Sequence, residues 1–295
     1  LIGLAGHEDF NLIELKQLTQ ALTEAGAATR LLTFDGGHAW PPEAQATQAV
    51  GWLELQAMKA GRRAQDNAWL EAWQNQQLAE ARTAESEQRW LAALATYEAL
   101  AQDFRGLSDV TAFASKAMEL RANKEVREQL KREKTADDLE RQKSQSFFEL
   151  LSRLQNADEG VTVWGQLKGQ IQDLRKKSAL NEDSSERTAA RRVLSSVIVS
   201  LNETSARLRA QKRYKEVALN LSLVTEARPD NPQAFVSLAR AQALSGNKKQ
   251  ALESLRKAVE LGLKDAAQLT GTTDFDAIRT EPAFKQLLEQ LGQKS

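Results

Sequence analysis

The chain has 295 residues, enough for two domains, and its 40 basic residues balance its 40 acidic residues. This balance gives no reason to expect a nucleic acid as partner. No apolar run approaches the ~18 residues that a membrane-spanning helix needs, so no membrane span is expected. With no cysteine and only two histidines, the usual ligands of zinc and softer metals are missing, and neither a metal nor another cofactor is expected. A chain without cysteine fits the cytoplasm and the periplasm equally, so its composition leaves the compartment open.

The first forty residues have the pattern of a strand, a helix and a second strand. Residues 1–6 are short, apolar and glycine-containing, as expected of a buried strand. Asn11 and Glu14 form a capping-box pattern, which predicts a helix that stops at Gly26. Three leucines recur at helical spacing within it: Leu15, Leu18 and Leu22. Residues 29–34 are rich in branched side chains and predict the second strand. Short connections in such a unit make the two strands parallel.

An acidic residue and a histidine follow the two predicted strands. Asp9 comes a few residues after the first strand, and His38 comes a few residues after the second. Because parallel strands end at the same edge of a sheet, where open α/β folds carry their chemistry, we expect the two side chains to meet. An acid and a histidine arranged in this way look like the last two members of a serine-hydrolase triad. The alternative is that each is an ordinary turn residue, which is how we interpret His7.

The segments around these residues resemble the end of the α/β-hydrolase fold, particularly its dienelactone-hydrolase and esterase-like branch. GHEDFN (residues 6–11) is similar to the acid-bearing turn, and GGHAWPP (residues 36–42) to the histidine loop. The resemblance implies that Asp9 orients the imidazole and that His38 is the general base and acid. The family's G-x-S-x-G nucleophile motif does not occur, and GLSDV (residues 106–110) lacks its second glycine.

Two strands and one helix cannot cover both faces of a sheet, and a two-stranded sheet is marginal by itself. The sequence also opens on Leu1, which lies within the first predicted strand. We therefore expect this chain to be the C-terminal portion of a longer hydrolase whose upstream body carries the serine. On this hypothesis the longer parent is the enzyme, and the chain alone is inactive.

From residue 43 onward the sequence is predominantly helical. Helices are expected over residues 43–60, 62–82 and 88–104, and a very long one over about 109–155 with Ser108 as its cap. The first of these carries Val50, Leu53 and Ala57 on one face, and the second carries Trp69 and Trp73 as a core pair.

The centre of the long helix, residues 130–139, is almost entirely polar. Residues of opposite charge occur four positions apart in and around this segment, as with Lys124 and Glu128. This pattern predicts a helix that is exposed to solvent on all sides and connects two parts of the protein. Breaks are expected at residues 158–160 and 178–185.

The C-terminal third has an internal period of thirty-four residues. Seven positions match the tetratricopeptide-repeat (TPR) pattern: Phe235, Leu238, Ala239, Gly246, Ala251, Leu255 and Ala258. One period earlier the matching residues are Val217, Leu221 and Val224, with Pro229 at the repeat-ending position. The chain thus resembles TPR proteins over residues 186–292 and, more weakly, over 64–120. Leu263 departs from the pattern because it replaces the second terminal proline, and residues 274–288 resemble a closing helix that shields the last repeat.

The predicted fold is mainly α, a TPR-like helical-repeat array preceded by a terminal βαβ remnant of an α/β-hydrolase fold. Three domains are predicted. Residues 1–60 are the hydrolase fragment, and residues 61–185 are a degenerate TPR-like helix pair with a long charged helix. Residues 186–295 are the repeats with their closing helix.

Two functions remain open from the sequence. The first is the C-terminal portion of a serine hydrolase of ester or peptide-like acyl bonds, with a TPR module that binds a protein or peptide. The second is a non-enzymatic TPR scaffold. The resemblance implies that Gln233, Val236 and Arg240, together with Ala243, face the peptide-binding groove. Arg240 is the only charged residue among them and would anchor an acidic peptide or a terminal carboxylate. The alternative interpretation is that Arg240 is an ordinary solvated helix residue.

Overall fold

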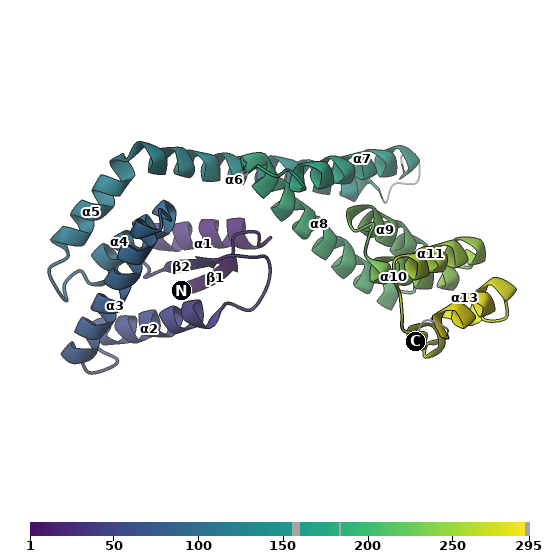
Figure 1. Cartoon of the computed structure of the whole chain (residues 1–295), viewed down its shortest axis with the longest axis horizontal. Coiled ribbons are helices and arrows are strands. Elements are labelled where there is room, and N and C mark those ends of the chain that lie inside the picture. Colours follow the sequence, from purple (N-terminus) through teal and green to yellow (C-terminus); the bar gives the residue numbers. More distant parts are fainter. Residues whose placement is uncertain (155–159, 183, 293–295) are drawn as a thin grey trace. The chain divides into compact units, whose positions relative to one another are not determined.

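The computed structural model describes residues 1–154, 160–182 and 184–292 (Figure 1). The protein is mainly helical and contains a two-stranded parallel sheet, which confirms the predicted fold class at this level. Its contacts divide the chain into two compact units. The first comprises residues 1–139 and 184–188, and the second comprises residues 140–183 and 189–295. The predicted boundary at residue 60 lies within the first unit. None of the described helices is long and apolar enough to cross a membrane.

The N-terminal βαβ unit is present as predicted. Strand β1 (Ile2–Gly6) pairs in parallel with β2 (Arg30–Phe34), in a register that runs from Ile2 opposite Arg30 to Gly6 opposite Phe34. Helix α1 (Leu12–Glu24) connects the strands, and α2 (Glu43–Lys59) follows β2. Gly26 has a φ of +83°, the left-handed conformation that ends a helix most easily at glycine.

The capping box predicted at the start of α1 is wrong. The side chain of Asn11 makes no capping hydrogen bond, because its backbone is already helical, with φ −88° and ψ −7°. A capping residue normally has an extended backbone that lets its side chain reach back to the first turn. The Asp9 carboxylate instead accepts a hydrogen bond of 2.9 Å from the backbone N–H of Asn11.

Helix α2 packs through a different face from the one that its branched residues suggested. Val50 and Leu53 are 61% and 51% exposed, whereas Trp52 and Leu55 are buried. Gly51 lies on the buried face, where a Cβ atom would come within 2.3 Å of the Trp73 ring. A side chain at residue 51 would therefore overlap the Trp73 ring unless that ring moved.

Helices α3 (Asn67–Ser86) and α4 (Trp90–Asp103) continue the first unit. Trp69 and Trp73 stack with ring centroids 5.7 Å apart and pack on the buried cluster of this unit, as predicted for a core pair. The same cluster includes Leu55 and Met58 of α2, so α2 belongs to the helical core.

The single long helix predicted over residues 109–155 is two helices, α5 (Thr111–Ala122) and α6 (Lys124–Arg153). Asn123 separates them with an extended backbone, φ −61° and ψ 134°, and its Oδ1 accepts a hydrogen bond of 2.8 Å from the N–H of Glu125. Ser108 does not cap α5. Its hydroxyl accepts a hydrogen bond from Gln74, and the Asp109 carboxylate accepts the N–H of Thr111.

The polar centre of α6 is only partly a solvent-bridging segment. Lys124 and Glu128 form the predicted ion pair, at 3.9 Å. However, Ala136 is buried, and the Asp137 carboxylate lies 2.9 Å from the ammonium of Lys16 in α1. Part of this helix therefore packs within the first unit.

A buried ion pair connects the sheet to the helices of the first unit. One guanidinium nitrogen of Arg30, at the start of β2, lies 2.9 Å from Oδ2 of Asp103, at the end of α4. Trp52 of α2 donates its indole N–H to Oδ1 of Asp103 at 3.2 Å, and Lys59 donates to the Asp103 carbonyl at 2.8 Å. Burial raises the pKa of the Asp103 carboxyl, which the Arg30 charge opposes, and burial also lowers the pKa of Arg30.

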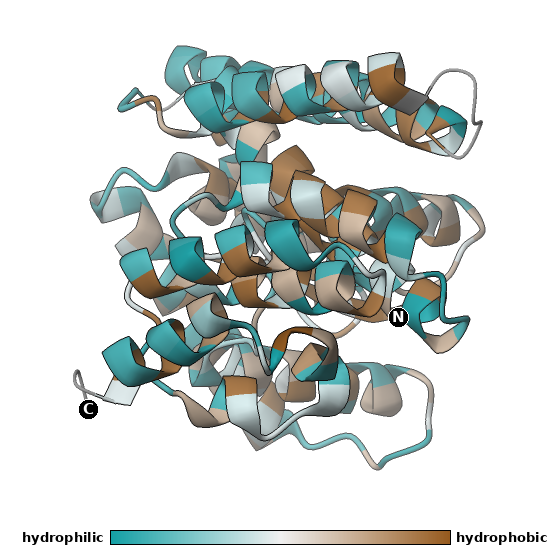
Figure 2. Ribbon diagram, turned by 90° about the vertical axis from the view of Figure 1, so that its right-hand side faces the viewer, coloured by the Kyte–Doolittle hydropathy of each residue, from teal (hydrophilic) through white to brown (hydrophobic). Residues whose placement is uncertain are grey.

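The second unit consists of helices and the loops that connect them, and its described residues form no strand. It contains part of α6 and the following elements: α7 (Gly160–Ser178), α8 (Ser185–Ala210, from Ala189 onward), α9 (Tyr214–Ala227), α10 (Pro232–Leu244), α11 (Lys248–Glu260), α12 (Ala267–Thr270), η1 (Thr273–Ile278) and α13 (Pro282–Gly292). Hydrophobic and hydrophilic residues alternate along these ribbons as expected of amphipathic helices (Figure 2). The predicted break at residues 178–185 is present, whereas residues 158–159 of the other break lie outside the described residues.

Two hydrophobic clusters stabilise the second unit. The larger one joins the end of α6 to α7, α8, α9 and α10. Beside it, Arg192 of α8 and Glu140 of α6 form a pair at 3.6 Å in which both residues are almost fully buried. The smaller cluster joins α10 and α11 to η1 and α13, where Phe275 and Phe284 are both 0% exposed. The single closing helix predicted over residues 274–288 is instead two elements, the 3-10 helix η1 and the α-helix α13.

Asp103→Asn should destabilise the protein by about 3 kcal/mol, because it leaves the buried Arg30 charge without its partner. The double variant Arg30→Met/Asp103→Leu removes both charges and should recover most of that loss. Urea unfolding curves of the three proteins measure the difference. Equal stability of the single variant and the parent would show that the pair does not hold the sheet to the helices.

Candidate functional site

The two loops that follow β1 and β2 are connected through their backbones. The N–H of His7 donates to the Phe34 carbonyl, and the N–H of Glu8 donates to the Gly36 carbonyl, both at 2.8 Å. A Cβ atom on Gly6 would lie only 2.2 Å from the Gly36 carbonyl oxygen, so this approach requires glycine. The parallel register and these bonds bring residues 7–11 next to residues 35–38.

Asp9 and His38 meet at this edge of the sheet, as the sequence predicts. The Nδ1 atom of His38 lies 3.2 Å from Oδ2 and 3.3 Å from Oδ1 of Asp9. Asp9 is 4% exposed, and the hydrogen bond from the N–H of Asn11 holds its carboxylate in place. The His38 side chain is 61% exposed, and its ring centroid lies 4.7 Å from that of Phe10. The acid is therefore fixed, and the imidazole is in contact with solvent.

This arrangement has a definite chemical capacity. A carboxylate beside Nδ1 favours the tautomer that carries its proton there, which leaves the Nε2 lone pair available to accept a proton. His7 differs, since its Nε2 lies 4.0 Å from the fully exposed carboxylate of Asp35. Among the described residues, no group of three or more histidines, cysteines and acids could hold a metal ion.

Phe10 and Asn11 support the Asp9–His38 pair, and no sequence pattern indicates this role for either residue. Asn11 has a pattern that predicts a helix cap, and its actual contribution is a backbone N–H. Phe10 is a single aromatic residue in a loop, with no periodicity to mark it. Only the folded loop shows that the Phe10 ring lies against His38.

The three residues predicted for a peptide groove lie in different environments. Gln233 is exposed at the start of α10, and Arg240 is partly buried, with Nη2 donating to the Gln268 carbonyl at 3.0 Å. Val236 is only 2% exposed, as is Ala243. Both belong to the buried cluster that also contains residues of η1 and α13, and α10 itself packs against η1. The prediction that Val236 faces an open groove is therefore wrong.

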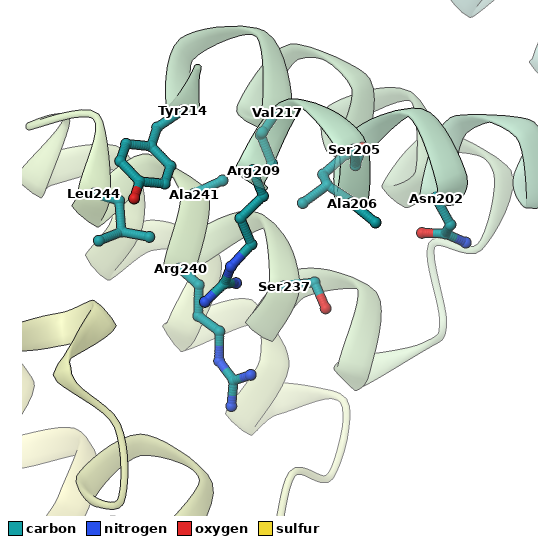
Figure 3. A pocket seen from close by; sticks show the side chains of 11 residues that line it. Asn202, Ser205, Ala206, Arg209, Tyr214, Val217, Ser237, Arg240, Ala241 and Leu244 are labelled. Carbon is teal, nitrogen blue, oxygen red and sulfur yellow. The ribbon is translucent and has the colours of Figure 1, made fainter. Parts of the chain in front are cut away.

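A pocket of about 160 Å³ lies between α8, α9 and α10 (Figure 3). Arg209 of α8 and Arg240 of α10 line one side, and their guanidinium groups point in the same direction. Tyr214, Val217 and Leu244 contribute to the other walls. The sequence points to Arg240 as a groove residue and to Val217 and Leu221 as repeat positions, but it does not indicate that these residues line one pocket with Arg209.

Comparison of the chain with known protein families, with curated proteins and with solved structures finds no match. The arguments about function therefore depend on the geometry of these two sites and on the sequence patterns that led to them.

Asp9→Asn should reverse the tautomer of neutral His38. The amide oxygen would keep the hydrogen bond from Asn11, so its NH₂ group would face Nδ1 and select the form with the proton on Nε2. Imidazole ¹⁵N chemical shifts measure this change directly. His7, the only other histidine, is the internal control and should not change. A neutral His38 already protonated on Nε2 in the unaltered protein would contradict the proposed contact.

Proposed function

We propose that Asp9 and His38 are the acid and the base of a serine-hydrolase-type triad, which acts on an ester or peptide-like acyl bond. The observation that carries this proposal is the buried Asp9 carboxylate 3.2 Å from Nδ1 of a solvent-exposed imidazole, at the carboxyl edge of parallel strands. The order of the chain, acid before histidine, and the resemblance to the end of the α/β-hydrolase fold support it.

In this mechanism Asp9 orients the His38 ring and stabilises the imidazolium that forms during the reaction. Nε2 of His38 removes the proton from the nucleophilic hydroxyl as that oxygen attacks the acyl carbon. The same nitrogen then delivers the proton to the leaving group. The exposure of the ring is compatible with this role, because Nε2 must be accessible to both the nucleophile and the substrate.

The proposal requires a nucleophile and oxyanion-hole donors from residues other than these 295. The sequence has no G-x-S-x-G, and Ser108 binds Gln74 in the loop before α5. We infer that the chain carries the acid and base of the site and that the catalytic hydroxyl belongs to an additional segment of the same protein.

The chain alone should therefore not hydrolyse a p-nitrophenyl ester faster than free imidazole does. In a longer protein that includes the nucleophile, His38→Ala should lower kcat by about 10⁴-fold or more. His7→Ala is the matched control and should leave the rate unchanged. A burst of acylation by the chain alone that is lost in the His38→Ala variant would contradict the missing nucleophile, and an active His38→Ala longer protein would contradict the triad.

We further propose that residues 186–292 are TPR-like helix pairs that bind a protein partner. The supporting observation is the close packing of α10 on α11 through small residues, since Ala239, Ala251 and Ala258 are each 0% exposed. Small residues at such positions are typical of paired repeat helices. With Val236 covered, the partner would contact Gln233 and the partly buried Arg240 on α10.

A photocrosslinking amino acid at Gln233 should capture a specific partner in cells, whereas one at Glu253 on α11 should not. Arg240→Glu should lower the yield by roughly tenfold, because it reverses the charge that would anchor an acidic group. Arg256→Glu, an exposed arginine on α11, is the matched control for charge. Equal crosslinking from α10 and α11 would place the binding surface elsewhere.

A further inference from the structure

The pocket between α8, α9 and α10 joins a cationic side to an apolar side. Its lining includes the two arginines Arg209 and Arg240 and no acidic residue. Val217, Leu221 and Leu244 supply the apolar wall. At about 160 Å³ it is smaller than pockets for drug-sized ligands, which run to roughly 300–1,000 Å³. The pocket therefore suits a compact ligand with one anionic end and one short hydrocarbon end.

Arg240 has unused hydrogen-bonding capacity beside this pocket. Its Nη2 donates to the Gln268 carbonyl, but its buried Nε has no acceptor among the described residues. Leaving a buried N–H of a charged group without an acceptor is costly. Because this nitrogen has almost no accessible surface, a ligand oxygen would reach it and remove that cost only if the Arg240 side chain moved toward the pocket.

Arg209 already binds a carboxylate that belongs to the protein. Its Nη2 lies 2.8 Å from Oδ2 and 3.0 Å from Oδ1 of Asp274, in the η1 segment. The side chain of Asp274 is 11% exposed, whereas that of Arg209 is 48% exposed. The Asp274 carboxylate thus competes for the same cation that an incoming anion would use.

We propose that this pocket binds a small aliphatic monocarboxylate, with Asp274 as a built-in competitor for Arg209. The ligand carboxylate would accept hydrogen bonds from Arg240 and Arg209, and its carbon chain would lie against Val217 and Leu244. This proposal goes beyond the protein-binding role of the helices, because the ligand is a small molecule held between three helices.

Titration of the whole chain with isobutyrate, followed by NMR, tests the proposal. Isobutyrate should produce a saturable shift of the Arg240 Nε–H resonance, and isobutyramide, which has the same shape without the charge, should not. Arg240→Gln should weaken binding by about tenfold or more, because a charge-assisted donor is lost. Arg207→Gln, on the same helix as Arg209 but outside the pocket, is the control for net charge.

The Asp274→Asn variant distinguishes binding in this pocket from non-specific attraction of the anion to positive charge. It should tighten isobutyrate binding several-fold, since it removes the competing carboxylate, whereas Asp276→Asn in the same η1 segment should not. The double variant Arg209→Gln/Asp274→Asn leaves no buried charge unpaired and should bind more weakly than Asp274→Asn alone. Three results would each overturn the proposal: equal binding of the amide, binding of inorganic phosphate as tight as that of isobutyrate, or no saturable shift in the Asp274→Asn protein.

Discussion

The close approach of the Gly6 backbone to the Gly36 carbonyl is the constraint on which the Asp9–His38 site depends. Parallel pairing alone brings the two strand ends to one edge, but it does not set the distance between the loops that follow. The missing Cβ at Gly6 lets the second loop lie directly over the first, and backbone hydrogen bonds then fix the two together. A side chain at residue 6 would force the loops apart and move the imidazole away from its carboxylate.

Strand β2 is held at both of its ends. Its final residue accepts a hydrogen bond from the loop that leads to Asp9, and its first residue, Arg30, pairs with Asp103 of α4. A two-stranded sheet is marginal without additional packing, so this attachment to α2 and α4 matters more than it would in a larger sheet. A buried ion pair is not a large net source of stability, but its geometry is demanding. Its contribution here is to define where the strand lies on the helices.

Local patterns in the sequence were sufficient for the N-terminal βαβ unit and for the Asp9–His38 contact. Strand composition and helical spacing can be recognised from neighbouring residues. The parallel βαβ geometry that they predict then brings Asp9 and His38 together, although the two are distant in sequence. Two kinds of contact cause the failures: a local helix cap at Asn123 and tertiary packing around Val236. Asn123 breaks a run of good helix formers, because its side chain caps the next helix more effectively than it continues the first. Val236 has the right spacing for a groove, but nothing local to it indicates that it is buried in the cluster that α10 forms with α11 and the C-terminal elements.

The contact between Gly51 and the Trp73 ring has a consequence for natural sequence variation. Glycine is normally a poor residue in a helix interior, and drift would be expected to replace it with alanine. A methyl group there would overlap the indole, so a larger residue at position 51 requires the Trp73 ring to move or to be replaced by a smaller one. Val50, the adjacent residue, is exposed and free of this restriction. Two successive positions of one helix should therefore evolve at very different rates, although neither takes part in any chemistry.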